Sequence, residues 1–342
     1  MNPLRCAVIG CGRIGCGFDE KSNLRNPKTH AGSYFINPKT KLVALCDIDK
    51  SKLEKFGKKF NVDNLYTDTK EMFSRENLDC ISICTLVDTH LDLVEEAIRF
   101  GVKAIFLEKP ISDSLDNAHR IVTLCKKNNV TLIIDHQRRF DPVYHSVQNF
   151  IKKKNLGNLQ LIDVHYGAGI ANTGSHVFDM LRMFFGEVSY VSAKYSKNKS
   201  VNVQDPNLDV SLEFANGMLC NLHALDVSNY GILEMDVFGT MGRLRFNLAT
   251  SDVEYFKTSD KDFLVYKNLV QSKIKINKST RTPISLGIQN MINCVMKKDY
   301  PLSTGMDGYK SLELIVASLK SSKLNRRISL PMVRNSFKIK SR

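Results

Sequence analysis

The opening of the chain is the feature that most constrains its fold. A short apolar segment, Leu4–Ile9, runs directly into the pattern GCGRIG at residues 10–15. Gly10 allows a tight turn, Gly12 lets the backbone approach a pyrophosphate, and Gly15 permits a helix to pack closely on the strand. A helix that begins here offers its first amides to phosphate. We therefore predict a dinucleotide-binding turn, with a glycine-rich turn that binds nothing as the alternative.

The rest of the first half alternates short apolar segments with segments of helical spacing. The expected strands are Lys41–Cys46, Cys80–Thr85, Lys103–Leu107 and Val130–Ile134, and the expected helices are Thr89–Phe100 and Leu115–Asn128. Near-continuous apolar strands that alternate with helices indicate a parallel sheet covered on both faces. We expect an α/β fold whose N-terminal part is a doubly wound Rossmann sheet.

An acidic residue follows the second expected strand. Asp47 comes directly after Leu42–Cys46, where a carboxylate binds the ribose diol of NAD. A carboxylate there would repel the 2′-phosphate of NADP, so NAD is the expected cofactor, with NADP still possible. Asp47 lies 32 residues after Gly15, against roughly 20 in the simple fingerprint. The excess fits an insertion over Gly17–Thr29.

After about residue 137 the pattern changes to consecutive strands. These are Leu159–Tyr166, Tyr190–Tyr195, Asp209–Phe214, Met218–Leu225, Gly231–Phe238 and Gly242–Phe246, and Gly287–Met296 and Gly308–Ser321 are expected helices. Asn216-Gly217 between two strands is a strong hairpin signal. The Lys-, Ser- and Asn-rich segment 258–282 is expected to be a long loop. We predict a Rossmann domain over 1–136 and an α/β domain with an open, largely antiparallel sheet over 137–342.

The net charge first suggests an anionic partner. The chain has 342 residues, a length typical of two domains, and 49 Lys+Arg against 35 Asp+Glu give +14. The positive residues are scattered, and no basic helix, zinc module or aromatic–basic RNA-binding pattern is present. We expect no specific nucleic-acid partner; the excess charge helps to attract an anionic cofactor and a phosphate- or carboxylate-bearing sugar.

Cysteine usage and hydropathy bear on the compartment. The nine cysteines are odd in number, and most lie in or beside apolar segments. They lack the paired spacing of a zinc site or a disulfide framework, so we expect reduced thiols and no metal. No apolar segment approaches the roughly 20 residues of a membrane span. The chain also runs straight into its first strand, which leaves no room for a signal peptide. We expect a cytoplasmic protein without a membrane partner.

Two polar motifs carry candidate chemistry. The first is Glu108-Lys109-Pro110 at the carboxyl end of an expected parallel strand, the edge where such sheets bind ligands. A buried lysine there has a lowered pKa, can donate to a substrate oxygen and can help to move its proton. The alternative is a solvated lysine in a loop without a catalytic role.

The second motif is the segment NTGSHVFD at residues 172–179. His176 and Asp179 are three positions apart and so share one face of a helix. A histidine near the start of such a helix can face the cofactor cleft as a general base. A histidine packed at a domain interface is the alternative.

Together these motifs resemble the Gfo/Idh/MocA (glucose–fructose oxidoreductase, inositol dehydrogenase, rhizopine catabolism) family. The resemblance covers nearly the whole chain. It rests on the opening GxGxxG, Leu42–Asp47, Ile83–Thr85 followed by His90, Ala104–Pro110, His136–Pro142, Gly174–His176 with Asp179, and Pro301–Ser321. The order and spacing of these segments are more specific than any one of them.

The resemblance implies an NAD(P)-dependent oxidoreductase. Members transfer a hydride between nicotinamide and a secondary alcohol or ketone of a sugar or cyclitol. For this chain we expect a sugar, a cyclitol or a nucleotide-linked sugar as the substrate. It implies that Lys109 and His176 are catalytic and that the open sheet forms a homodimer or homotetramer. The expected cofactor-binding residues are Gly10, Gly12, Arg13, Ile14, Gly15, Asp47, Thr85, His90, Glu108 and Lys109.

One position departs from the inositol-dehydrogenase pattern. Asn172 stands where those members carry an aspartate four residues before the histidine. Asparagine can bind a hydroxyl and orient His176, but it cannot accept a proton at neutral pH. We therefore expect Asn172 to be catalytic together with Lys109 and His176. The short segment 166–176 resembles a sub-branch from surface-polysaccharide and nucleotide-sugar pathways.

The remaining expectations concern the substrate and the alternative functions. The expected substrate-binding residues are Lys109, Arg138, Tyr144, Asn172 and His176. Arg138 suits a carboxylate or phosphate because its guanidinium binds such groups in bidentate fashion; interdomain packing is the alternative role for Arg138 and Tyr144. A catalytically silent NAD-binding regulator and an inositol 2-dehydrogenase remain as alternative functions.

Overall fold

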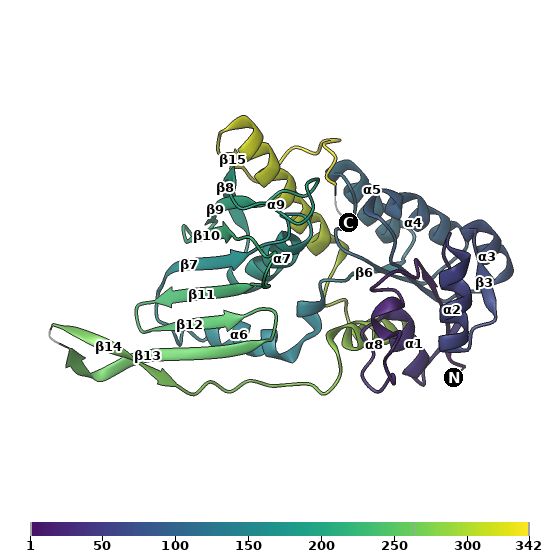
Figure 1. Ribbon diagram of the computed structural model, residues 1–342, viewed down its shortest axis with the longest axis horizontal. Coiled ribbons are helices and arrows are strands. Elements are labelled where there is room, and N and C mark those ends of the chain that lie inside the picture. Colours follow the sequence, from purple (N-terminus) through teal and green to yellow (C-terminus); the bar gives the residue numbers. More distant parts are fainter. Residues whose placement is uncertain (1, 264, 341–342) are drawn as a thin grey trace.

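The computed structural model describes residues 2–263 and 265–340, which form two sheets side by side (Figure 1). Over these residues the first sheet has six parallel strands in the order β3-β2-β1-β4-β5-β6. They are β1 (Leu4–Ile9), β2 (Thr40–Cys46), β3 (Asn64–Tyr66), β4 (Cys80–Ile83), β5 (Ala104–Leu107) and β6 (Thr131–Ile134). The predicted doubly wound sheet is confirmed. Only β3 was missed, because three residues are too few to show a periodicity.

Helices cover both faces of this sheet, and alternate residues of β1 show it. Cys6 and Val8 belong to one apolar cluster, and Ala7 and Ile9 belong to the other. The helices that follow the strands are α1 (His30–Ile36), α2 (Lys50–Phe60), α3 (Thr69–Arg75), α4 (His90–Arg99) and α5 (Leu115–Lys127). Burial of both faces explains why the strands are apolar throughout.

The second sheet is mixed and mostly antiparallel. Within the described chain its nine strands run in the order β14-β13-β12-β11-β7-β10-β9-β8-β15, and only the β10–β7 pair is parallel. The strands are β7 (Leu159–Tyr166), β8 (Val188–Tyr195), β9 (Leu208–Phe214), β10 (Leu219–Ala224), β11 (Glu234–Gly239), β12 (Gly242–Asn247), β13 (Asp252–Phe263), β14 (Tyr266–Ser272) and β15 (Ile328–Ser329). Burial alternates along β9 and β12, as in a sheet with one covered face.

Four helices accompany this half of the chain. They are α6 (Pro142–Lys152), α7 (Thr173–Phe185), α8 (Pro283–Val295) and α9 (Gly305–Leu324). Helix α8 returns to the first sheet, where a side chain on Gly287 would come within 2.8 Å of the Phe106 ring and 2.9 Å of the Phe140 ring. Within the described ranges, no helix combines the length and the apolar character that crossing a membrane requires.

The expectation of a long loop over 258–282 is wrong. Strands β13 and β14 form a hairpin that projects from the sheet (Figure 1). Residues 266–271 are all exposed, so β14 has no buried face and lacks the alternation that identifies a half-buried strand. The irregular connection shrinks to residues 273–282.

The predicted insertion lies between two parts of one helical turn. The amides of His30 and Ala31 donate to the carbonyls of Ile14 and Gly15 at 3.2 and 3.0 Å. Helix α1 therefore continues the turn that the glycine pattern begins, and residues 16–29 form an excursion from it. The expectation of a helix that begins directly at the pattern is corrected accordingly.

Asp19 holds this excursion in place. Its side chain is fully buried and accepts from the Lys28 amide at 2.9 Å and from the Thr29 hydroxyl at 2.6 Å. Thr29 in turn caps α1 by accepting from the Gly32 amide. One carboxylate thus connects the excursion to Thr29, the residue that caps α1 and precedes His30.

We expect Asp19→Ala to destabilise the protein by about 2 kcal/mol, because it leaves buried donors without an acceptor. Urea unfolding followed by circular dichroism measures this change, and proteolysis within residues 16–29 should become faster. Glu20→Ala is the control, since Glu20 is exposed. Equal stability of the two variants would contradict the role given to Asp19.

Candidate active site

A cleft of about 920 Å³ lies at the carboxyl ends of the first sheet. Its walls come from the turn after β1, the ends of β2, β4, β5 and β6, and the residues around the start of α7. The lining includes Gly10, Gly12, Arg13, Ile14, Asp47, Thr85, Glu108, Lys109, Asp135, Gln137, Arg138, Asn172 and His176. Most of the residues expected at the site therefore meet in one cavity.

The glycine turn forms the floor of one end of the cleft. A side chain on Gly15 would come within 2.0 Å of the Gly10 carbonyl oxygen, whereas one on Gly12 would meet nothing within 4 Å. Gly15 thus packs the turn, and Gly12 leaves open space on the cleft side. A backbone bare of side chains beside an open space suits a pyrophosphate.

Asp47 closes this end of the cleft. Its carboxylate accepts from the Cys11 amide at 2.6 Å and from the Asp49 amide at 2.9 Å, which fixes its orientation. The side chain is only partly buried and lines the cleft. Gly12 and Asp47 together fit the pyrophosphate and ribose of NAD.

Lys109 and Asn172 meet at the other end. Lys109 Nζ donates to the Asn172 side-chain and backbone oxygens at 3.2 and 3.3 Å. Asn172 precedes α7 but makes no capping bond with its side chain; its backbone amide donates to Asp205 at 2.8 Å. Burial lowers the pKa of Lys109, against the opposing effects of Glu108 and Asp135.

His176 faces the same space from α7. Its Nδ1 is buried without a hydrogen-bond partner among the described residues. Burial lowers its pKa well below the usual value, and the positive charges of Lys109 and Arg138 and the nearby His136 add to this effect. His176 is therefore neutral at neutral pH and able to accept a proton.

Arg138 lines the cleft but is anchored from behind. Its guanidinium donates to the Tyr144 hydroxyl at 3.1 Å and to the Leu248 carbonyl at 3.0 Å. Tyr144 is almost fully buried and donates to the same carbonyl at 2.9 Å. Tyr144 therefore orients Arg138 and does not reach the cleft, which corrects its expected contact with substrate.

His90 also lies behind the cleft wall. It is fully buried, and its ring nitrogens contact the carbonyls of Ile111 at 3.2 Å and Thr85 at 3.3 Å. The expected contact with the cofactor is thus replaced by support of the Thr85 loop. Gly15 is likewise a packing residue beneath the cleft.

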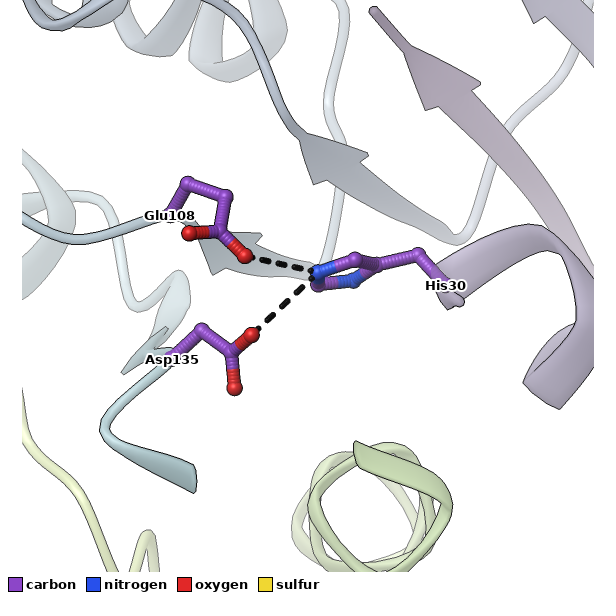
Figure 2. Close-up of side chains that lie close together, drawn as sticks. All are labelled: His30, Glu108 and Asp135. Carbon is purple, nitrogen blue, oxygen red and sulfur yellow. Dashed lines mark hydrogen bonds and ion pairs between the residues drawn. The ribbon is translucent and has the colours of Figure 1, made fainter. Parts of the chain in front are cut away.

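Sequence reasoning missed a buried cluster beneath Lys109. Figure 2 shows one nitrogen of the His30 ring pointing toward the carboxylates of both Glu108 and Asp135. His30 Nε2 lies 3.2 Å from Glu108 Oε1 and 3.5 Å from Asp135 Oδ2. These are ion-pair distances, so we interpret the group as an ion cluster. Asp135 directly follows β6, and this position at a strand end could have identified it as a candidate site residue. His30 follows the excursion, and its position in the sequence gives no such indication.

Comparisons with known proteins agree with this geometry. The family model for the NAD-binding Rossmann fold of the Gfo/Idh/MocA oxidoreductases matches residues 4–136, and the model for their C-terminal alpha/beta domain matches residues 162–330. The chain is 25% identical to D-apiose dehydrogenase from Paraburkholderia graminis, over 93% of this chain and 88% of that protein. It is also 25% identical to scyllo-inositol 2-dehydrogenase (NAD(+)) from Bacillus subtilis, over 97% and 98%.

Solved structures share the fold. The WlbA dehydrogenase from Bordetella pertussis, in complex with NADH and UDP-GlcNAcA, superposes with a TM-score of 0.79 at 19% identity, covering 97% of this chain and 100% of that one. The glycine turn, the position of Asp47 and both family models point the same way: the chain belongs to the Gfo/Idh/MocA family of oxidoreductases, with an NAD-binding Rossmann domain followed by the family's C-terminal α/β domain.

Proposed function

We propose that this oxidoreductase oxidises a secondary alcohol of a sugar, cyclitol or nucleotide-linked sugar, or reduces the matching ketone, with Lys109 and His176 as the catalytic residues. The observation that carries the proposal is that a lysine and an unpartnered neutral histidine line the same end of a cleft whose other end fits NAD. The relatives named for sugar and inositol dehydrogenation support this substrate class.

The NAD site follows from the floor of the cleft. Gly12 admits the pyrophosphate, Asp47 binds the ribose diol, and Arg13, Ile14 and Thr85 line the same space. When bound, NAD supplies the acceptor for the hydride that leaves the carbinol carbon. The chain's own residues must then bind the alcohol and move its proton.

Lys109 and His176 divide that task. An ammonium can donate three hydrogen bonds. Lys109 donates two of them to Asn172, so the third is available for the substrate oxygen. That bond stabilises the negative charge that develops on the oxygen. Neutral His176 accepts the hydroxyl proton at Nε2, the ring nitrogen opposite the buried Nδ1. Arg138 borders the same space and favours an anionic group on the substrate.

Cyclitol oxidation of the inositol 2-dehydrogenase type is the second candidate. The Bacillus subtilis relative supports it. Asn172 provides an acceptor for Lys109 without a negative charge, so the site differs in charge from one with aspartate there. The panel of substrates described next separates the two candidates.

We expect NAD reduction with at least one member of a panel of sugars, nucleotide sugars and cyclitols. Lys109→Ala and His176→Ala should each lower kcat by roughly 100-fold, the usual loss of a general acid–base group, while NAD binding persists. Lys103→Ala is the matched control, because Lys103 lies on the surface in an ion pair with Asp79. Full activity in both catalytic variants would refute the assignment, and tight NAD binding without any turnover would favour a silent regulator.

Asp47→Asn should change the choice of cofactor. Loss of the charge weakens the bond to the ribose diol, so the Kd for NAD should rise about tenfold, while NADP binds more tightly than before. Calorimetric titration of both cofactors measures this. Asp63→Asn, at an exposed position, should leave both affinities unchanged. If the ratio of the Kd values for NAD and NADP were unaltered in Asp47→Asn, the contact between Asp47 and the ribose would be ruled out.

The pH profile of oxidation tests the role of His176. The base acts only when neutral, and its pKa is lowered by burial and by Lys109, Arg138 and His136. The acid limb of kcat/KM should therefore lie below pH 6.5, about the ordinary histidine value. Arg138→Gln removes a positive charge that lowers this pKa, so it should move the limb to higher pH. An unchanged limb in that variant would contradict the assignment.

A further inference from the structure

The cluster of His30, Glu108 and Asp135 joins three separate elements. His30 begins α1, Glu108 follows β5 and Asp135 follows β6 (Figure 2). His30 is fully buried, and its Nδ1 lies 2.9 Å from the Ser82 hydroxyl. Gln137 donates to Asp135 Oδ2 at 3.2 Å. Two carboxylates and one imidazole are thus held at fixed positions away from bulk water.

The cluster changes its charge near neutral pH. Burial opposes the charged form of His30, but its hydrogen bonds to Asp135 and Glu108 favour that form, and its pKa is raised well above the usual value, so His30 is protonated. Burial opposes ionisation of Asp135, yet its contacts with His30 lower its pKa. Burial and the charge of Asp135 raise the pKa of Glu108 to about 7. Glu108 is therefore the member of the cluster that gains or loses a proton.

Other charged and titratable groups face this carboxylate. Cys84, after β4, is a neutral thiol, because burial raises its pKa to about 11. Lys109 is the next residue; burial lowers its pKa, Arg138 from the 3-10 turn Gln137–Phe140 adds to this effect, and Asp205 opposes it. After burial, Asp135 and His30 have the largest effects on the pKa of Glu108, and the neighbouring Lys109 also interacts with its charge.

Glu108 and Asp135 both line the cleft on the side of Lys109. The reactive ring of the cofactor must lie at this end, because hydride transfer needs it beside the substrate that Lys109 and His176 bind. Oxidised nicotinamide carries a positive charge that the reduced form lacks. A nearby carboxylate therefore distinguishes the two redox states by its charge alone.

We propose that Glu108, held between His30 and Asp135, is a charge-compensating residue that binds oxidised nicotinamide in preference to reduced nicotinamide. This inference rests on the proposed function for the position of the reactive ring. It also balances the reaction: the alcohol loses a hydride to the cofactor and a proton from its hydroxyl, the carbonyl forms, and the positive charge of the ring disappears. His176 holds the hydroxyl proton, so the total charge of the site is unchanged, and Glu108, no longer facing the positive charge of the ring, gains proton affinity.

The test is the ratio of the Kd values for NADH and NAD+, measured by fluorescence and calorimetric titration in the absence of any sugar. In the wild-type protein the preference for NAD+ should strengthen as the pH rises through about 7, because NAD+ favours the ionised carboxylate. Glu108→Gln should lower the preference about tenfold above that pH and abolish its pH dependence. A lost hydrogen bond would weaken both forms alike, so the ratio isolates the charge.

His30→Gln provides an independent outcome. Without the imidazolium the pKa of Glu108 rises further, so in this variant the NAD+ preference should strengthen only at a higher pH than in the wild type. Should it fail to fold, Glu108→Gln decides alone. His119→Gln and Glu71→Gln, outside the cleft, are the matched controls and should behave as wild type.

The proposal would be overturned if the ratio of the Kd values for NADH and NAD+ were the same in Glu108→Gln and in the wild type across the pH range. The proposed function fails in a different way, through the absence of NAD reduction with every substrate. Because the binding ratio is measured without substrate, either result can be obtained without the other.

Discussion

The close approach of backbone segments at the end of β1 governs the position of everything in the cleft. A side chain on Gly10 would come within 2.7 Å of the Cys84 carbonyl oxygen, and one on Gly15 would come within 2.0 Å of the Gly10 oxygen. The turn, the loop after β4 and the start of α1 can therefore meet without intervening side chains. This contact places His30 beneath the carboxyl ends of β5 and β6, where Glu108 and Asp135 begin the loops that carry Lys109 and Arg138.

Much of the first domain could be predicted because its physics is local. An apolar strand such as Leu4–Ile9 reads as a strand wherever both faces of the sheet are covered, and the structure has the same bounds. Elements without such a pattern, such as β3 and the β13–β14 hairpin, were not predicted from the sequence. In the hairpin, residues 266–271 are exposed on both faces, so sequence periodicity had nothing to record.

Site residues could be predicted from the sequence when they directly follow an expected strand or begin an expected helix. Lys109, Asp47 and His176 stand at strand ends or a helix start, where position alone suggests chemistry, and all three line the cleft. Tyr144 and His90 were polar residues beside those motifs, but only the tertiary packing reveals that they face away from it. His30 was the converse case, because its partners lie 78 and 105 positions along the chain and no local signal joins them.

Helix α8 has a consequence for how the protein is assembled. It packs on β5 and on the turn that contains Phe140, although strands β7 to β14 lie between them in the sequence. During synthesis, the part of one face of the Rossmann sheet formed by β5 and β6 therefore lacks its covering helix until residue 295 has left the ribosome. A ribosome-bound chain that ends before α8 would expose the apolar surface around Phe106 and Phe140 and become a target for chaperones. The first domain is the first to be made, yet it is completed only by one of the last helices.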